Sequence, residues 1–369
     1  MALPSPDVVS GAAICTYFRT FRSSGRYGVP VTAPERLRLD LVRPRGPASL
    51  EEWFSPLSAV DRADWPGDPG WSLHERAALL DQPGVRDHVL GVARVGAAVV
   101  GCFQLRMELL DNLDAADIEV WVDPAWQHRG IGRALLEAAE GHAAARRRRV
   151  LSGTTEAPLG SPEAEHRDRF ARDAGYEPAL AETRWQLDVP VDPARLDALE
   201  SEARARASGY RLVCWEGPCP REWEAGRVRA AASMSTDIPL GELAAEPETW
   251  DVARLRQFEH VVEAMGRATI AVAAISPDGE LAGFTQIGVP RETPVVAYQF
   301  DTIVMPAHRG HRLGMLLKVA NLRRLAEVFP ATRRVVTTNA TSNEPMIRIN
   351  EQLGFRLTGT GTVWQRRLT

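Results

Sequence analysis

A duplicated glycine turn constrains this chain more than any other feature of its sequence. The stretch VDPAWQHRGIG at residues 122–132 returns as VMPAHRGHRLG at residues 304–314, which is a displacement of about 182 positions. The same displacement pairs further residues, namely Gly101 with Gly283, Glu119 with Asp301, Val122 with Val304, Pro124 with Pro306, Gln127 with Arg309 and Gly132 with Gly314. A constant offset across strands and a turn indicates an internal repeat, so we expect two copies of one α/β unit.

In each copy an apolar strand runs into the turn, and the turn runs into an amphipathic helix. We call residues 127–132 the first cradle and residues 309–314 the second cradle. Glycine lets a ligand approach the backbone, and the N–H groups and dipole of a helix N-terminus attract anions. A single turn of this kind is explained equally well by ordinary turn and helix-cap chemistry. Its repetition favours a pair of anion-binding cradles.

Length and composition define the broad class of protein. A chain of 369 residues suits two domains, and 44% hydrophobic residues with a net charge of −4 are typical of a soluble globular protein with no nucleic-acid partner. The four cysteines are scattered without the spacing of a zinc or redox motif, so we expect no metal site and a reducing, cytoplasmic compartment. We expect neither a membrane span nor an export signal. A homo-oligomer remains open.

Turn residues and periodicity suggest the domain boundaries. Residues 1–34 lack periodicity and suggest a leader that could be disordered. An N-terminal domain is expected at 35–190 and a C-terminal domain at 209–369. The intervening residues 191–208 predict a charged helix without a strong apolar face, which fits a linker. A capping-box pattern at Ser49 predicts the start of the first helix.

The order of strand, cradle, helix, strand and a helix ending in Leu-Gly-Phe resembles the GNAT superfamily of N-acetyltransferases. The run QHRGIG at residues 127–132 matches the superfamily signature Gln/Arg-x-x-Gly-x-Gly/Ala, and residues 343–355 resemble its late helix. The likeness covers about 330 residues and extends to actinobacterial tandem proteins similar in layout to mycothiol synthase. It implies an α/β (α+β) fold of two tandem GNAT domains, each a mixed, mostly antiparallel, splayed sheet flanked by helices.

The resemblance also implies an activity, namely acetyl-CoA-dependent transfer of an acetyl group to the primary amine of a small molecule. The tyrosine that protonates the leaving thiolate in many members would fall at Asn350 in the second copy and at Ala171 in the first. Neither an asparagine nor an alanine side chain can protonate a thiolate as the phenol of tyrosine does. The alternative is therefore a protein that binds CoA or acyl-CoA without turnover, with one or both domains degenerate.

The resemblance assigns acetyl-CoA to the cradles. The pyrophosphate would meet the cradle amides, and the pantetheine arm would complete the gap between two splayed strands through main-chain atoms. The expected cofactor-binding residues are Val122, Gln127, Arg129, Gly130, Gly132, Val304, Arg309, Gly310, Arg312, Gly314 and Asn339. Arg312 stands where the signature has its first glycine, so the second cradle either turns this side chain outward or holds phosphate less closely. Lys318 is expected to add charge at an exposed position.

Carboxylates in the apolar strands are the candidate bases, because amide synthesis requires a neutral amine. Asp301 and Glu119 lie three residues before the terminal valine of each strand, where a buried carboxylate needs a role or a partner. Either could instead pair with an arginine or a backbone N–H. Asn343 is expected to contact the acetyl or pantetheine carbonyl or, alternatively, to cap the next helix. Asp237 is a candidate site for a cationic acceptor, and we favour the second copy for catalysis.

Overall fold

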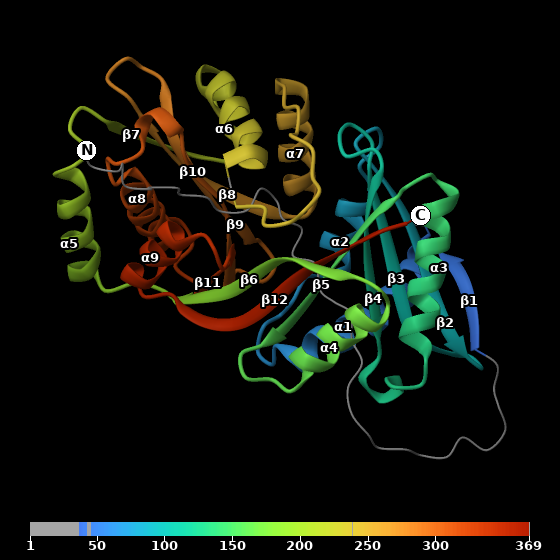
Figure 1. Ribbon diagram of the computed structural model, residues 1–369. Coiled ribbons are helices and arrows are strands. Elements are labelled where there is room, and N and C mark those ends of the chain that lie inside the picture. Colours follow the sequence, from blue (N-terminus) through green and yellow to red (C-terminus); the bar gives the residue numbers. More distant parts are fainter. Residues whose placement is uncertain (1–36, 43–45, 238, 369) are drawn as a thin grey trace. The chain divides into compact units, whose positions relative to one another are not determined.

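The computed structural model describes residues 37–42, 46–237 and 239–368 of the chain (Figure 1). The leader expected at residues 1–34 lies outside this range. The described residues form two compact units, which we treat separately. The N-terminal unit comprises residues 37–181, 240–245 and 359–368, and the C-terminal unit comprises residues 182–239 and 246–358, apart from the undescribed residues within these ranges.

The first half of the chain supplies six strands and four α-helices among the described residues. In chain order they are β1 (Leu37–Val42), α1 (Pro47–Asp64), α2 (Leu73–Leu80), β2 (Arg86–Val95), β3 (Ala98–Glu108), β4 (Ala115–Val122), α3 (Ile131–Ala145), β5 (Val150–Pro158), α4 (Glu163–Asp173) and β6 (Glu177–Asp188).

The second half repeats this order with one additional helix at its start. Its elements are α5 (Pro193–Arg204), β7 (Arg211–Glu216), α6 (Glu224–Asp237), α7 (Val252–Ala264), β8 (Arg267–Ile275), β9 (Leu281–Pro290), β10 (Val296–Val304), α8 (Leu313–Val328), β11 (Arg334–Ala340), α9 (Glu344–Leu353) and β12 (Arg356–Arg367). Short 3-10 helices, η1 (Pro124–Trp126) and η3 (Pro306–His308), lead into the two cradles.

The sheet of each unit is mixed and mostly antiparallel, which confirms the predicted fold class. In the N-terminal unit the strand order is β1-β2-β3-β4-β5-β12, and in the C-terminal unit it is β7-β8-β9-β10-β11-β6. The parallel pairs are β4 with β5 and β10 with β11. Each parallel pair is bonded over three residues on either strand and then diverges, at Asp117 and Ser152 in one unit and at Tyr298 and Val336 in the other. The sheets therefore splay directly below each cradle.

Helices bury apolar side chains against both faces of each sheet. In the N-terminal unit, α3 buries Ile131, Leu135 and Ala139 at helical spacing against one face, and α1 buries Trp53 and Leu57 against the other. In the C-terminal unit, α5, α8 and α9 share one core, and α6 packs on the opposite face. All nine residues of β8 are buried, as expected of a central strand covered on both faces.

The unit boundaries differ from those expected at residues 190 and 209. Residues Glu182–Asp188 of β6 pair with β11 and belong to the C-terminal unit. Residues Gly359–Arg367 of β12, although they end the chain, pair with β5 and complete the sheet of the N-terminal unit. Turn residues mark where a strand ends but not which strand it joins. The two halves have therefore exchanged their final strands.

The helix expected to be a linker is part of a core. Leu196 and Ala203 of α5 are buried in the core that includes α8, and Leu199 packs against it. Their spacing of three and four residues places them on one helical face. This stripe of apolar side chains is narrow and lies among many charged residues, so the sequence did not reveal it. The predicted capping box at Ser49 was also wrong, because α1 begins after Gly46 and the capping box lies at Ser72 and Glu75.

Candidate active site

The second cradle forms a pocket at the start of α8. The chain leaves β10 through η3 and reaches α8 through Gly310 and Arg312, which both adopt the left-handed backbone conformation at φ 84° and 54°. The first backbone N–H groups of a helix have no acceptor within it. The pocket has a volume of about 120 Å³. It is lined by Val304, His308, Arg309, Gly310, Arg312, Leu313, Gly314, Met315, Pro345, Arg348, Ile349 and Gln352.

Arginine side chains surround this pocket, and none of the described residues that line it is acidic. Each guanidinium pairs with a carboxylate outside the lining: Arg309 with Asp237 at 3.1 Å, Arg312 with Glu202, and Arg348 with Glu344 at 3.2 Å. Helix N–H groups and cations at one opening are suited to a diphosphate. The Arg312 side chain pairs with α5 rather than filling the turn, as the first of its two predicted alternatives requires.

The two cradles use the same two strained positions but place glycine differently. In the first cradle the left-handed residues are His128, at φ 59°, and Gly130, at φ 79°. Gly310 therefore corresponds to His128, and Arg312 to Gly130. Each cradle carries one glycine and one side chain at these positions. The two turns are thus more similar in backbone conformation than in amino-acid sequence.

The first cradle is packed by a ring from α4. A Cβ atom on Gly132 would lie 3.5 Å from the ring of Phe170. Arg129 stacks on the ring of Trp126 at 4.8 Å and donates to the oxygen of Ala125 at 3.3 Å. The late helices align through Gly175 and Gly354, so the residue of α9 that corresponds to Phe170 is Ile349, which lines the pocket. The described geometry therefore gives the second cradle the clearer opening.

Asp301 occupies a β-bulge in the strand that leads to the second cradle. The register of β10 with β9 shifts between Gln299 and Thr302, so two residues of β10 face one residue of β9. Arg227 of α6 donates to Oδ2 of Asp301 at 3.2 Å, while Oδ1 has no hydrogen-bond partner among the described residues. Burial raises the pKa of Asp301 to about 7, against the opposing effect of Arg227. This carboxylate can exchange a proton near neutral pH.

Glu119 is the counterpart of Asp301 in the first copy, but its surroundings differ. The register of β4 with β3 runs without a shift from Gly101–Val122 to Arg106–Asp117. Burial raises the pKa of Glu119 to about 8, with Arg76 opposing the shift. Oε2 of Glu119 has no hydrogen-bond partner in the described part of the chain. Burial thus favours the protonated form of Glu119, as it does for Asp301.

A buried polar chain links α8, α9 and β11 behind the second cradle. Lys318 Nζ donates to Asn350 Oδ1 at 2.5 Å, and Asn350 Nδ2 donates to Asn339 Oδ1 at 2.8 Å. Lys318 is only 1% exposed, so its expected position at an exposed loop was wrong: it lies one helical turn beyond Gly314 and faces inward. Burial lowers the pKa of Lys318 to about 7. Asn350, at the position of the absent tyrosine, therefore bridges an amine and an amide.

The structure places the other predicted residues as follows. Asn343 caps α9 by accepting from the N–H of Met346 at 3.3 Å, which is the alternative considered for it. Asp237 accepts a hydrogen bond through Oδ2 from Nη2 of Arg309. Val122 and Val304 are buried at the ends of their strands, with main-chain oxygens that accept from Gln127 and Arg309. Sequence reasoning missed Arg227, which no spacing rule connects to Asp301.

Among the described residues, no group of three or more His, Cys, Asp and Glu side chains is arranged to hold a metal ion. In the same part of the chain, no helix is both long and apolar enough to cross a bilayer.

Comparison with known proteins agrees with this geometry. The family profile described as "Acetyltransferase (GNAT) domain" matches residues 86–178. A mycothiol acetyltransferase from Sanguibacter keddieii is 30% identical over 253 residues, which cover 65% of this chain and 70% of that protein. Among solved structures, a tandem GNAT protein from the clavulanic acid biosynthesis pathway is 26% identical with a TM-score of 0.72, covering 90% of this chain and 98% of its own.

A more distant structure shows the fold alone. The GCN5-related N-acetyltransferase from Sphaerobacter thermophilus is 14% identical with a TM-score of 0.60, covering 91% of this chain and 97% of its own. The splayed sheets, the two cradles and these relatives define an acyltransferase of the GNAT type. The chain belongs to the GNAT acetyltransferase family, and within that family it is a tandem protein resembling mycothiol acetyltransferase in layout. GNAT proteins generally use acetyl-CoA, and the cationic second cradle is suited to its diphosphate.

Proposed function

We propose that this protein transfers the acetyl group of acetyl-CoA to the primary amine of a small molecule, and that the C-terminal unit performs the reaction. The observation that supports this proposal is the environment of the Asp301 side chain. It is a buried carboxylate with one oxygen lacking a described partner, in a bulge of β10 beside the splay that opens toward the second cradle. The similarity to a mycothiol acetyltransferase supports a small-molecule acceptor.

In the proposed reaction the second cradle holds the diphosphate of acetyl-CoA, and the pantetheine arm follows the gap between β10 and β11. Asp301 accepts a proton from the acceptor ammonium, which leaves a neutral amine. The amine nitrogen attacks the thioester carbonyl carbon, a C–N bond forms, and the C–S bond breaks with its electron pair on sulfur. The nitrogen gives up its second proton to the departing thiolate, so the products are the acetamide and the free thiol of CoA, and protonated Asp301 returns its proton to solvent.

The bulge offers a second contribution to the chemistry. Phe300 and Asp301 stand outside the regular ladder between β10 and β9, and a bulge leaves a backbone group without its ladder partner. A backbone N–H aimed at the thioester carbonyl would stabilise the negative charge that develops on its oxygen. The corresponding strand of the first copy has a regular register, which favours the second copy for catalysis.

The test uses the full-length protein with acetyl-CoA and a panel of primary amines. Release of free thiol together with a product heavier by one acetyl group supports acetyl transfer. A rise in melting temperature with CoA, but no thiol release with any amine, would instead support a protein that binds CoA without turnover. Asp301→Asn in the same assay separates enzymatic turnover from spontaneous thioester hydrolysis.

A further inference from the structure

Gln286 faces the bulge that contains Asp301. Gln299 pairs with Ile287, and Thr302 pairs with Thr285, so Gln286 of β9 stands opposite both Phe300 and Asp301. Side chains directly opposite on adjacent antiparallel strands have Cβ atoms roughly 4.5–5.5 Å apart. The carboxylate of Asp301 and the amide of Gln286 are therefore neighbours.

Gln286 is buried, and its side-chain oxygen accepts no hydrogen bond from the described residues. Its side chain is 5% exposed, and Oε1 has no hydrogen-bond partner among the residues that the structure describes. Oδ1 of Asp301 and Nη1 of Arg227 are also buried without a hydrogen-bond partner among the described residues. Buried polar atoms are nearly always hydrogen-bonded, so three such atoms in one place offer two acceptors and one donor that a bound molecule can use.

The first copy contains the same pair of residues, and there the glutamine amide is hydrogen-bonded within the copy. Gln104 lies 182 positions before Gln286 and stands opposite Glu119 in the regular register. Its Nε2 donates to Nδ1 of His88 at 3.3 Å. Burial, with Arg106 and Arg86 nearby, lowers the pKa of His88 to about 3, so the imidazole is neutral and can accept.

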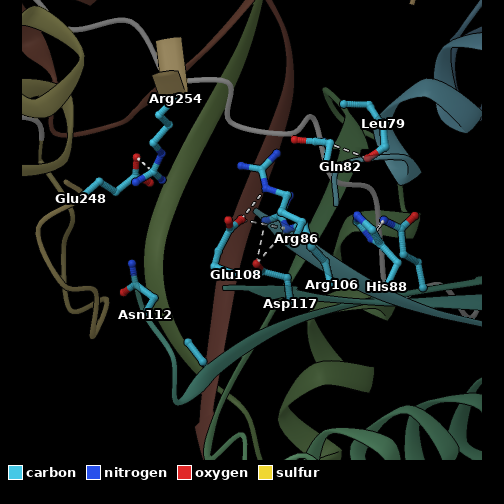
Figure 2. Close-up of polar contacts among 12 residues, drawn as sticks. Leu79, Gln82, Arg86, His88, Arg106, Glu108, Asn112, Asp117, Glu248 and Arg254 are labelled. Atoms are coloured by element: carbon cyan, nitrogen blue, oxygen red, sulfur yellow. Dashed lines mark hydrogen bonds and ion pairs between the residues drawn. The ribbon is translucent and has the colours of Figure 1, made fainter. Parts of the chain in front are cut away.

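Ion pairs complete this part of the sheet in the first copy. Figure 2 shows Arg86 with Glu108 and Arg106 with Asp117, beside His88; the shortest contacts are 2.7 Å and 2.6 Å. The N-terminal unit thus fills the area beside Gln104 with its own paired side chains.

Aromatic rings take the place of these ion pairs in the second copy. The residue 182 positions after Arg106 is Gly288, and a Cβ atom there would lie 2.5 Å from the ring of Phe300. Phe284, two residues before Gln286 on the same face of β9, carries the guanidinium of Arg227 over its ring at 4.1 Å. The amide of Gln286 therefore lies between two apolar rings. A molecule bound here would meet the amide of Gln286 and the carboxylate of Asp301 beside aromatic rings.

We propose that Gln286 is a specificity residue that hydrogen-bonds a hydroxyl or amide group at the carbon adjacent to the one that bears the acceptor amine. The inference rests on the proposed function, in which Asp301 takes a proton from that amine. Because Gln286 and Asp301 are neighbours, the two groups that they contact belong on adjacent carbons. The acceptors are then 1,2-amino alcohols or α-amino amides that carry an apolar substituent.

The test compares phenylalaninol with 2-phenylethylamine, which lacks the hydroxymethyl group. Values of kcat/KM are expressed per ammonium form, the form from which Asp301 takes a proton in the proposed reaction. The wild-type protein should prefer phenylalaninol by about tenfold, the effect of one hydrogen bond. Gln286→Met, similar in volume but without the amide, should abolish the preference and leave the KM for acetyl-CoA unchanged. Gln104→Met, the matching change in the first copy, should retain the preference.

Each other outcome has a definite meaning. Equal kcat/KM values for the two amines in the wild-type protein, or a preference that survives Gln286→Met, would overturn the role of Gln286. An equal loss on both amines in Gln286→Met, with a lower melting temperature, would make the residue merely structural and would also overturn it. Absence of thiol release with every amine would reject acetyl transfer itself, and this inference with it.

Discussion

Arg309 donates a hydrogen bond from Nε to the main-chain oxygen of Val304 at 3.2 Å, which ties the start of the second cradle to the end of β10. In the first copy Gln127 makes the same contact from Nε2 to the oxygen of Val122 at 3.0 Å. Two different side chains thus hold the two cradles in the same way. Arg309 differs from Gln127 in its positive charge, which forms an ion pair with the carboxylate of Asp237.

Arg309→Gln should therefore preserve the shape of the second cradle while removing its charge. A partly exposed charge is worth about 1 kcal/mol or less, so we expect the Kd for CoA to rise by up to about fivefold. Arg309→Ala removes the contact with Val304 as well and should weaken binding further. Isothermal titration calorimetry with CoA distinguishes them. Equal affinity losses in the two variants would show that the contact with Val304 is unimportant.

Asp301 should control the pH dependence of turnover. Burial raises its pKa to about 7, so the carboxylate fraction, and with it kcat, should increase as the pH rises through about 7. Asp301→Asn should lower kcat by about 10²–10⁴ and remove this limb of the pH profile, because a general base is worth about that factor. Asp278→Asn, in the exposed turn between β8 and β9, is the control. An unchanged pH profile in Asp301→Asn would reject Asp301 as the base.

Arg312 should make the protein less stable than a glycine at this position would. It holds the left-handed conformation at φ 54°, which costs a residue with a side chain about 1–2 kcal/mol, and its exposed ion pair with Glu202 returns about 1 kcal/mol or less. Arg312→Gly, which copies Gly130, should raise the free energy of unfolding by about 1 kcal/mol or less. The reciprocal Gly130→Arg should lower it. Urea denaturation measures both, and a less stable Arg312→Gly would contradict the strain.

Trp364 should stabilise the N-terminal unit although it lies near the end of the chain. Its ring is buried in the core of that unit, and Nε1 donates to Oγ1 of Thr155 on β5 at 2.9 Å. Trp364→Ala should destabilise the unit by about 3–5 kcal/mol through the cavity that it leaves. Hydrogen exchange should then show protection lost mainly in residues 37–181. Loss confined to β8, β9 and β10 would contradict the exchange of strands, and Trp364→Phe is the milder control.

The sequence predicted those parts of the fold that depend on local pattern and on repetition. The 182-residue offset located both cradles, and the apolar strands predicted to run into them are β4 and β10. The exchange of β6 and β12 could not be predicted, because strand periodicity says which face is buried and not which neighbour completes the sheet. The buried stripe of α5 was hidden for a related reason, since Leu196 and Ala203 stand among charged residues.

The candidate site was predicted in part. The carboxylate at Asp301 was found because it interrupts an apolar strand, but its bulge and its contact with Arg227 depend on tertiary packing. Lys318 was misplaced because a lysine in the first turns of a helix is usually exposed, whereas here Asn350 provides a buried acceptor. Gln286 could have been found from the sequence, since the offset that paired Glu119 with Asp301 also pairs Gln104 with Gln286.

The most direct test of the account is acetyl-CoA-dependent thiol release by Gly314→Glu. Gly314 lines the pocket at the first turn of α8, and a glutamate there would place bulk and negative charge where the diphosphate is expected to bind. The control is Gly141→Glu, which adds the same charge at an exposed position of α3 with open space around it. We predict that Gly314→Glu loses turnover while Gly141→Glu retains it. Wild-type turnover and an unchanged KM for acetyl-CoA in Gly314→Glu would contradict the assignment of the second cradle.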